Sequence, residues 1–400
     1  MRALFTTQPF TGSFLPLVSL ARALVAAGHE IAVACSPSFC PTVASGGFRC
    51  VPVGLDFDSP EAHAAFAPLS DLPAGDAQTA WVWEHIFCGL PAERLVPALA
   101  ALHRTWPFDV VVRESNEFGG CLAAEALGVP HACVAADPYG SAYPRRRIFA
   151  GHLAGVRARL GLAPDPDGAS LYRHLYLAFF PRRIVPPGEA VAPTARFLRF
   201  VLGDGTNDDT LPPWVDDLPS SPTVHAPLGT VFHREPKLIR AILAGLRDEP
   251  ANLVLTVGRD QDPTQYGPQP PNVRIARYLP HGLLLPRCDL VLCHGGFGTL
   301  MAAVSCGLPL VVIPLGADQP HNGRRCVDLG IGQVVEPAAA TPEAIRDAVR
   351  AVLADPRFRH NARRLRAESE ALPGPDHGAD LVERLVAQAS GANAPEPASR

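Results

Sequence analysis

Charge is scarce in this chain, and neither sign dominates. Charged residues make up 18% of the 400 residues, and 35 basic side chains against 39 acidic ones leave a formal net charge of −4 at pH 7. Arginine supplies nearly all of the positive charge, because Lys237 is the one lysine. A near-neutral chain with a pI of about 6.4 argues against a protein that binds nucleic acid or an anionic membrane surface.

Long apolar runs are absent as well. Hydrophobic residues make up 47% of the chain, enough for two sizeable cores, but no uncharged apolar stretch reaches the roughly 20 residues that cross a bilayer. The N-terminus, MRALFTTQPF, has an early arginine but no long apolar core, which is not typical of a signal peptide. We therefore expect a cytoplasmic protein with no membrane span.

The ten cysteines lack the spacing of a zinc site. Cys35 and Cys40 are five residues apart, as are Cys288 and Cys293, and the sequence contains no CxxC pair. Most of the cysteines lie in apolar surroundings, where a thiol packs as a small hydrophobic side chain. The sequence thus predicts reduced, structural thiols in a reducing compartment, with neither a disulfide nor a bound metal.

One stretch, from Cys288 to Asn322, carries the strongest functional pattern. A short apolar strand at 290–293 leads into the turn HGGFGT, a helical run follows, and a second apolar strand at 310–314 ends shortly before the pair Asp318-Gln319. Small residues let the backbone approach phosphates, and the free N–H groups at the start of a helix favour negative charge. The stretch therefore predicts a nucleotide-binding βαβ unit.

The rest of the chain alternates strands with helices in two halves. This alternation predicts an α/β fold with parallel sheets covered by helices on both faces. A segment rich in Gly, Pro, Asp and Ser separates the halves, and the pattern restarts near Val224. We expect an N-terminal acceptor-binding domain at 1–205, a linker at 206–222, a nucleotide-sugar-binding domain at 223–377, a helix crossing both domains at 378–389 and a disordered tail at 390–400.

The HGGxGT turn and the DQ pair resemble the donor-binding box of inverting, nucleotide-sugar-dependent natural-product glycosyltransferases from actinobacteria, of the macrolide, aromatic polyketide and enediyne type. The resemblance covers nearly the whole chain and is strongest in the C-terminal half. It implies the GT-B fold, in which two Rossmann-like domains face each other across a cleft.

The resemblance also assigns donor-binding roles to ten residues. They are His294, Gly296, Gly298, Thr299 and Thr230 for the phosphates, Tyr278 and Leu279 for the nucleobase, Asp318 and Gln319 for the sugar hydroxyls, and Arg259 after a preceding strand. An imidazole and helix N–H groups can stabilise a departing diphosphate without a cation. No acidic cluster suited to Mg²⁺ accompanies these turns, so we expect no metal and no cofactor beyond the nucleotide diphosphate sugar.

One departure from the family pattern concerns the donor. Members often carry a glutamate three residues after the threonine of HGGxGT, where it binds the ribose hydroxyls, and this chain has Ala302 there. A thymidine nucleotide has no 2′-hydroxyl, so the missing carboxylate costs less with a dTDP-sugar than with a UDP-sugar. The sequence favours dTDP over UDP.

A second departure removes the usual catalytic base. The family motif GHxxP places a histidine after the first strand, and this chain has Ser13, whose hydroxyl has too low a proton affinity to act as a base. Asp137 follows the strand at 131–135, in a loop where the aromatic-polyketide members that resemble this chain place a functional carboxylate. Glu114 and Glu117 follow the strand at 109–112 and are weaker candidates. A turn, cap or solvated role stays open for all three carboxylates.

Aromatic residues near the N-terminal loops suggest an apolar acceptor site. Phe10, Trp81, Trp83 and Phe87 are the candidates. Their spacing is equally typical of a helix packed on a core.

Together these features favour an enzyme that transfers a sugar, with inversion, from a dTDP- or UDP-sugar to a hydrophobic natural-product aglycone. Because Ser13 stands in place of the usual catalytic histidine, a non-catalytic partner or activator of the same fold stays an alternative. A nucleotide-sugar epimerase is less favoured, because it needs no large apolar acceptor cleft. The expected partners are the nucleotide sugar and the small-molecule aglycone, and a homodimer stays open.

Overall fold

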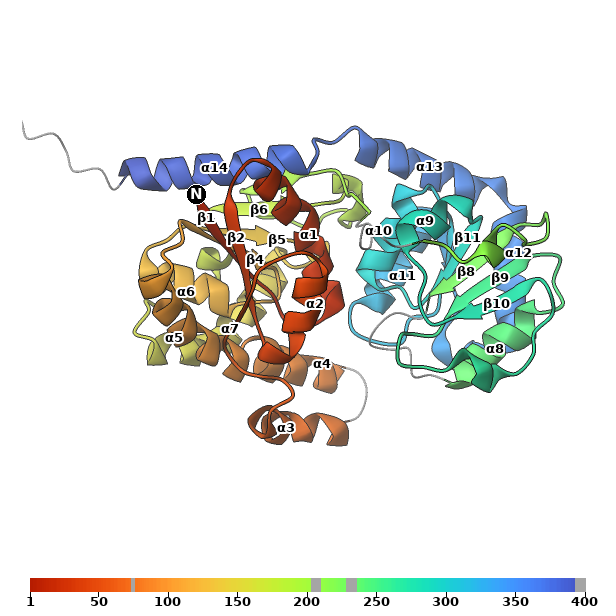
Figure 1. Ribbon diagram of the computed structural model, residues 1–400, viewed down its shortest axis with the longest axis horizontal. Helices are drawn as coiled ribbons and strands as arrows, with labels where there is room; N and C mark the ends of the chain where they lie inside the picture. The colour runs from red at the N-terminus through yellow and green to blue at the C-terminus, as the bar shows by residue number, and fades with distance from the viewer. Residues whose placement is uncertain (73–75, 203–209, 228–235, 393–400) are drawn as a thin grey trace, which may run out of the picture. The chain divides into compact units, whose positions relative to one another are not determined.

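Figure 1 shows the computed structural model of the 400-residue chain, which describes residues 1–72, 76–202, 210–227 and 236–392. The chain forms two compact units, one of Met1–Arg199 with Leu372–Arg400 and one of Phe200–Ala371. Each unit is built on its own parallel sheet with helices between the strands. The prediction of an α/β fold with two Rossmann-like units is confirmed.

The first unit contains a seven-stranded sheet whose neighbouring strands are parallel. Across the sheet the strands are β3 (Cys50–Pro52), β2 (Glu30–Cys35), β1 (Arg2–Thr6), β4 (Val110–Glu114), β5 (His131–Val134), β6 (Leu175–Ala178) and β7 (Ala195–Phe197). Strands β4 and β5 are buried along their whole length, and β1 and β2 at all but their first residue. Such apolar strands are expected where helices cover both faces of a parallel sheet.

The first helix, α1 (Thr11–Ala26), follows β1 and packs on the sheet. Its apolar residues Leu17, Leu20, Ala21 and Leu24 recur with the helical period and are at most 1% exposed. The other helices of this unit are α2 (Cys40–Ser45), α3 (Pro60–Phe66), α4 (Asp76–Val82), the π-helical turn η3 (Trp83–Phe87), α5 (Leu90–Thr105), α6 (Gly119–Leu127), α7 (Tyr143–Arg159) and α14 (Pro375–Ala392).

The second unit contains a six-stranded parallel sheet. Its strands, in order across the sheet, are β10 (Val273–Ala276), β9 (Asn252–Thr256), β8 (Thr223–Pro227), β11 (Leu290–Cys293), β12 (Leu310–Val312) and β13 (Gly332–Val334). Its helices are α8 (Pro236–Leu246), α9 (His281–Leu284), α10 (Phe297–Ser305), α11 (Gln319–Asp328), α12 (Pro342–Ala354) and α13 (Pro356–Glu370).

Each sheet has one point at which the strand order reverses. In the first unit it lies between β1 and β4, and in the second between β8 and β11. The connections that leave the two strands there go to opposite faces of the sheet, which opens a crevice at the carboxyl ends of the strands. Ligands of such sheets bind in that crevice.

The C-terminal helix α14 belongs to the first unit, where it lies along α1 (Figure 1). A Cβ on its Gly378 would lie 3.0 Å from Leu198 Cδ1 and 3.2 Å from Leu20 Cδ1, so the contact needs a small residue. The helix begins three residues before the predicted start at 378 and continues into the segment expected to be a tail, through Ala392, with the Ser390 hydroxyl bonded to the Val386 carbonyl. Of the expected linker, 206–209 lie outside the described residues, and 210–222 belong to the second unit.

The prediction of exclusively reduced thiols is wrong for one pair. Cys40, at the start of α2, and Cys50, at the start of β3, form a disulfide, and the other eight cysteines are free. Cys40 and Cys50 are separated by 10 residues in the sequence. The pairing of β2 with β3 also places Cys35 Sγ 3.6 Å from Cys50 Sγ. In the described part of the chain these three sulfurs are the one set of His, Cys, Asp or Glu side chains close enough to hold a metal ion, and the disulfide occupies two of them.

One helical stretch, Ala77–Thr105, is long and apolar enough to cross a membrane by length and composition, which the sequence did not predict. It joins α4, η3 and α5, and 39% of its most apolar window is buried inside the protein. A core helix passes the same test, so one such stretch is weak evidence of a span.

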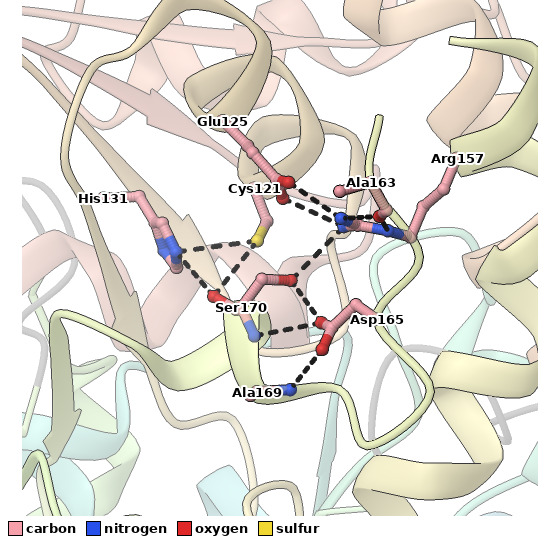
Figure 2. A network of polar contacts seen from close by, with 8 residues as sticks. All are labelled: Cys121, Glu125, His131, Arg157, Ala163, Asp165, Ala169 and Ser170. Carbon is pink, nitrogen blue, oxygen red and sulfur yellow. Dashed lines mark hydrogen bonds and ion pairs between the residues drawn. The ribbon is translucent and has the colours of Figure 1, made fainter. Parts of the chain in front are cut away.

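A buried polar network holds α6 and α7 to the segment 163–170 (Figure 2). Arg157 donates to both carboxylate oxygens of Glu125, at 2.9 and 2.7 Å. Asp165 accepts from the Ser170 hydroxyl at 2.6 Å, and the Ser170 carbonyl lies 3.0 Å from His131 Nε2. The network fixes the position of α6, and the loop before α6 carries side chains of the candidate site.

Candidate active site

The turn after β11 depends on two glycines. Gly295 has φ +88°, and a Cβ there would lie 2.7 Å from Val312 Cγ1. A Cβ on Gly296 would lie 2.6 Å from His294 Nε2, so the imidazole packs directly on this glycine. Gly296 is the N-cap of α10, and a Cβ on Gly298 would meet nothing within 4 Å. The first turn of α10 is therefore open at Gly298, beside half-buried Thr299.

His294 lies at the reversal point of the second sheet. It is 8% exposed and hydrogen-bonds to the backbone of Pro227, at the end of β8. Burial lowers the pKa of His294 to about 4, so the imidazole is neutral at pH 7. A neutral ring can offer an N–H to a phosphate oxygen without a buried charge.

The Asp-Gln pair is tied to the same turn through a residue that the sequence did not single out. The Asn322 amide donates to the Gly295 carbonyl at 2.9 Å and to Asp318 Oδ2 at 2.7 Å. Asn322 lies four residues after Asp318, which places both on one face of α11, and this spacing was the signal available in the sequence. The side-chain amide oxygen of Gln319 accepts hydrogen bonds from the N–H groups of Leu315 and Gly316, at 2.7 and 3.0 Å, so Gln319 fixes the conformation of this loop.

Arg259 and Tyr278 form a second part of the expected donor site. The Arg259 guanidinium carbon lies 3.7 Å from the centroid of the Tyr278 ring, which is 40% exposed. A cation over one face of an exposed ring holds its orientation and leaves a platform for stacking. The neighbouring Leu279 is buried, and Thr230 lies outside the described residues.

A cavity opens at the carboxyl ends of β1 and β2 in the first unit. Its empty volume, including open solvent, is about 330 Å³. The lining combines polar side chains with apolar ones from several loops: Thr7, Gln8, Ser36 and Glu117, with Leu55, Phe57 and Leu95. The cavity thus lies at the ligand-binding edge of this sheet.

Aromatic rings extend from this cavity. Phe57 meets Phe10 edge to face at 6.1 Å, and Phe10 meets Phe87 at 6.5 Å. Trp83 continues the cluster, 5.0 Å from Phe87. Trp81 instead stacks on His85 at 4.4 Å. Three of the four predicted acceptor residues therefore share one aromatic cluster.

The Erythromycin biosynthesis protein CIII-like family matches this chain in two parts, its N-terminal domain over residues 22–159 and its C-terminal domain over residues 240–387. A 10-deoxymethynolide desosaminyltransferase from Streptomyces venezuelae is 31% identical over 97% of this chain and 98% of its own length. The chain belongs to this family.

Other proteins are similar to this chain along nearly its whole length. A 4'-demethylrebeccamycin synthase from Lentzea aerocolonigenes is 30% identical over 96% of this chain and 99% of its own. The structure of the glycosyltransferase SnogD from Streptomyces nogalater matches with a TM-score of 0.79 at 27% identity, covering 96% of this chain and 100% of that one. This CIII-like chain is a nucleotide-sugar-dependent glycosyltransferase with the GT-B fold, of the kind that serves natural-product biosynthesis.

Asp137, Glu114 and Ser13 lie in different surroundings, and none of these three lines the described cavity, whereas Glu117, a weaker candidate from the sequence, does. Asp137 accepts from the Tyr139 N–H at 2.7 Å and from Arg145 at 3.0 Å, and Arg145 in turn lies over the Trp83 ring. Glu114 is fully buried, and burial raises its pKa to about 8. Ser13 is half-buried in the first turn of α1.

A buried arginine shapes the loop between β4 and α6. Arg113 is fully buried, and one of its terminal nitrogens donates to the carbonyls of Glu114, Ser115 and Glu117, at 3.1 to 3.2 Å. Its guanidinium lies between the rings of Phe118 and Tyr172. Arg113 therefore fixes the backbone from which Glu117 reaches the cavity.

Proposed function

We propose that this CIII-like glycosyltransferase moves a deoxysugar from a dTDP-sugar to a hydrophobic natural-product acceptor, with inversion and without a metal ion. The observation that carries the proposal is the donor turn of the second unit. There a neutral His294 and the start of α10 meet at the reversal of the sheet, and Asn322 holds Asp318 beside them.

The chemistry assigned to this turn is stabilisation of a departing diphosphate. The N–H groups at the start of α10 and the His294 imidazole offer hydrogen bonds to the oxygens on which charge develops. Donors of this kind perform the task that a divalent cation performs in other transferases. Activity in the presence of excess chelator tests this point, and activity that is lost in chelator and restored by Mg²⁺ would refute it.

The preference for dTDP is supported by Ala302, which is buried in α10 and offers no carboxylate to a ribose. The structure of a similar glycosyltransferase, VinC, at 26% identity and a TM-score of 0.78, is a complex with dTDP. That of SsfS6, at 28% identity, is a complex with thymidine diphosphate.

The acceptor is assigned to the first unit because of its cavity and the aromatic cluster of Phe10, Phe57, Phe87 and Trp83. Aromatic rings bury a large apolar area at small entropic cost, which suits a flat, hydrophobic aglycone. The acceptor hydroxyl must lose a proton as it attacks the anomeric carbon. Assignment of that step to Asp137, Glu114 or Glu117 stays a prediction. The cytoplasmic location also stays a prediction, because disulfides such as Cys40–Cys50 are rare in reducing compartments.

Calorimetric titration with dTDP and with UDP tests the donor assignment directly. We expect dTDP to bind more tightly, and we expect Ala302→Glu to narrow the difference by giving UDP a ribose partner. A clear preference of the unaltered protein for UDP would refute the dTDP assignment.

Ser13 favours one alternative, a non-catalytic partner that binds the nucleotide but transfers nothing. The two functions differ in a simple assay. A transferase releases dTDP from a dTDP-sugar in an acceptor-dependent manner, whereas a binding partner shows affinity for dTDP without turnover.

A further inference from the structure

The cavity in the first unit presents a single carboxylate. Its other polar side chains, Thr7, Gln8 and Ser36, carry no charge. Cys35 also faces the cavity, but burial raises the pKa of its thiol to about 12, so the thiol stays protonated at neutral pH. Within the described lining, Glu117 is the one carboxylate, and a carboxylate can accept the proton of a hydroxyl group.

Glu117 lies where the sheet of the first unit reverses. It follows β4, and it accepts a hydrogen bond from the hydroxyl of Thr6, the last residue of the neighbouring strand β1. The carboxylate therefore bridges the two strands between which a ligand crevice is expected.

Two glycines make room for this carboxylate. A Cβ on Gly120 would lie 2.6 Å from Glu117 Oε2, and one on Gly119 would lie 3.0 Å from Glu117 Oε1. With no side chain in the way, the Gly120 N–H donates to both oxygens at 3.0 Å. The carboxylate is thus held in one orientation, which a general base requires.

The charges around Glu117 leave it a stronger base than a solvated glutamate. Burial raises its pKa, while the Thr6 hydroxyl, the N–H groups of Gly119 and Gly120 and the Arg113 guanidinium oppose that rise. Glu114 on β4 and Cys121 on α6 are the other titratable groups that interact with it. A carboxylate with a raised pKa accepts a hydroxyl proton more readily than a solvated one.

The other candidates are less suited to the task. Asp137 does not line the described cavity, and its carboxylate is paired with the Arg145 guanidinium. Glu114 is fully enclosed, with one oxygen bonded to the Asn116 N–H at 2.6 Å.

We propose that Glu117 is the general base of the transfer, an inference that rests on the glycosyl transfer proposed above. The acceptor O–H bond breaks and its proton passes to a Glu117 oxygen. The acceptor oxygen forms a bond to the anomeric carbon, and the bond from that carbon to the diphosphate breaks with its electron pair on the leaving oxygen. Thr6 is a positioning residue that holds Oε2 of the base.

The test uses the full-length protein with dTDP-L-rhamnose, a deoxysugar nucleotide, as donor and 4-methylumbelliferone, a hydrophobic phenol, as acceptor. We expect Glu117→Gln to lower kcat/KM by about 10²-fold or more, the scale of a lost general base. Affinity for dTDP should not change, because Glu117 lies in the other unit. Asp137→Asn should cause a smaller loss than Glu117→Gln. Glu61→Gln, a half-exposed glutamate on α3, is the matched control.

Two further measurements distinguish a general base from a glutamate that only caps the start of α6. Formate, a small carboxylate, should restore part of the rate of Glu117→Ala. Thr6→Val removes a donor that lowers the pKa of Glu117, so the acidic limb of the kcat/KM profile should move to higher pH. Circular dichroism and thermal unfolding establish that each variant is folded.

The outcomes are distinct. A Glu117→Gln enzyme with rates near those of the unaltered protein, or with its acidic limb intact, would overturn the assignment and leave the proposed function standing. An unaltered protein that binds dTDP but transfers no sugar to this phenol or to a macrolide aglycone would overturn the proposed function, and the catalytic role of Glu117 with it.

Discussion

Burial sets the protonation state of single residues at both sites. The pKa of His294 falls to about 4, so the ring is neutral, whereas the pKa of Glu114 rises to about 8, so this carboxyl is mostly protonated at pH 7. Both groups avoid a charge that the interior would solvate poorly. In the proposed function the donor turn acts through oriented N–H groups, and the His294 imidazole packs on Gly296 of that turn.

Replacing His294 tests this arrangement. We expect His294→Ala to lower kcat by about 10²-fold, the typical loss of one donor to developing charge, and to weaken dTDP binding. His294→Gln keeps a side-chain N–H and should retain more of both. Steady-state kinetics and dTDP titration measure the effects, and an alanine variant with unchanged rate and affinity would remove His294 from the site.

At the scale of elements, the positions of α6 and α7 depend on the pair of Arg157 and Glu125 (Figure 2). The two side chains are 5% and 21% exposed. Because a charge left alone in such a place is poorly solvated, loss of one partner is costly.

Arg157→Met keeps the aliphatic stem but leaves Glu125 without this partner. We expect it to lower the free energy of unfolding by about 3 kcal/mol. Arg159→Met is the control, since its pair with Glu93 is 55% and 34% exposed and contributes under about 1 kcal/mol. Denaturant unfolding of both variants gives the comparison, and equal losses would mean that burial of the Arg157 pair adds nothing.

The disulfide between α2 and β3 closes a short loop, with a sequence separation of 10. The double variant Cys40→Ser with Cys50→Ser should lose about 2–3 kcal/mol of unfolding free energy, because the unfolded chain gains freedom. Reduction of the unaltered protein should cause a similar loss and raise the number of alkylated thiols from eight to ten. Ten thiols before reduction would show that the bond does not form in solution.

At the scale of the whole molecule, buried histidines make stability depend on pH. In the second unit burial lowers the pKa of His281 and His294 to about 4 and of His225 to about 3. The unfolded chain binds these protons near pH 6.5 and the folded unit does not, so stability is present above pH 6.5 and is lost as the pH falls towards 4.

Thermal unfolding between pH 7 and 5 measures this loss, which we expect to be about 2 kcal/mol per buried histidine at pH 5. His281→Phe removes one such group and should make the melting temperature less sensitive to acid. An unchanged pH dependence in that variant would show that His281 is not responsible.

Much of the fold was predictable because it depends on local patterns. The buried face of α1 follows from residues that recur with the helical period, and the turn at Gly295 needs a positive φ that glycine adopts freely. The donor residues from His294 to Gln319 lie within one short stretch, so their order along the chain already implied their proximity. Asn322, on the next helix, hydrogen-bonds to the carbonyl of Gly295 in the same turn. Its spacing of four residues from Asp318 could have predicted this from the sequence.

The acceptor side was less predictable, because its parts come from distant segments. Thr6 and Glu117 meet through the pairing of β1 with β4, and the Cys40–Cys50 disulfide forms where the chain passes from α2 to β3. No spacing rule links such positions. Asp137 looked better placed than Glu117 as long as only the strand order was known.

The sequence by itself determined the α/β class, the division into two halves and the glycine-rich turn after β11, since each depends on local periodicity, composition and glycine placement. Only the tertiary structure decided which carboxylate lines the acceptor cavity, which histidines are neutral and which cysteines are bonded. Those properties arise from burial and from contacts between segments far apart in the chain, and they exist only once the sheets have formed.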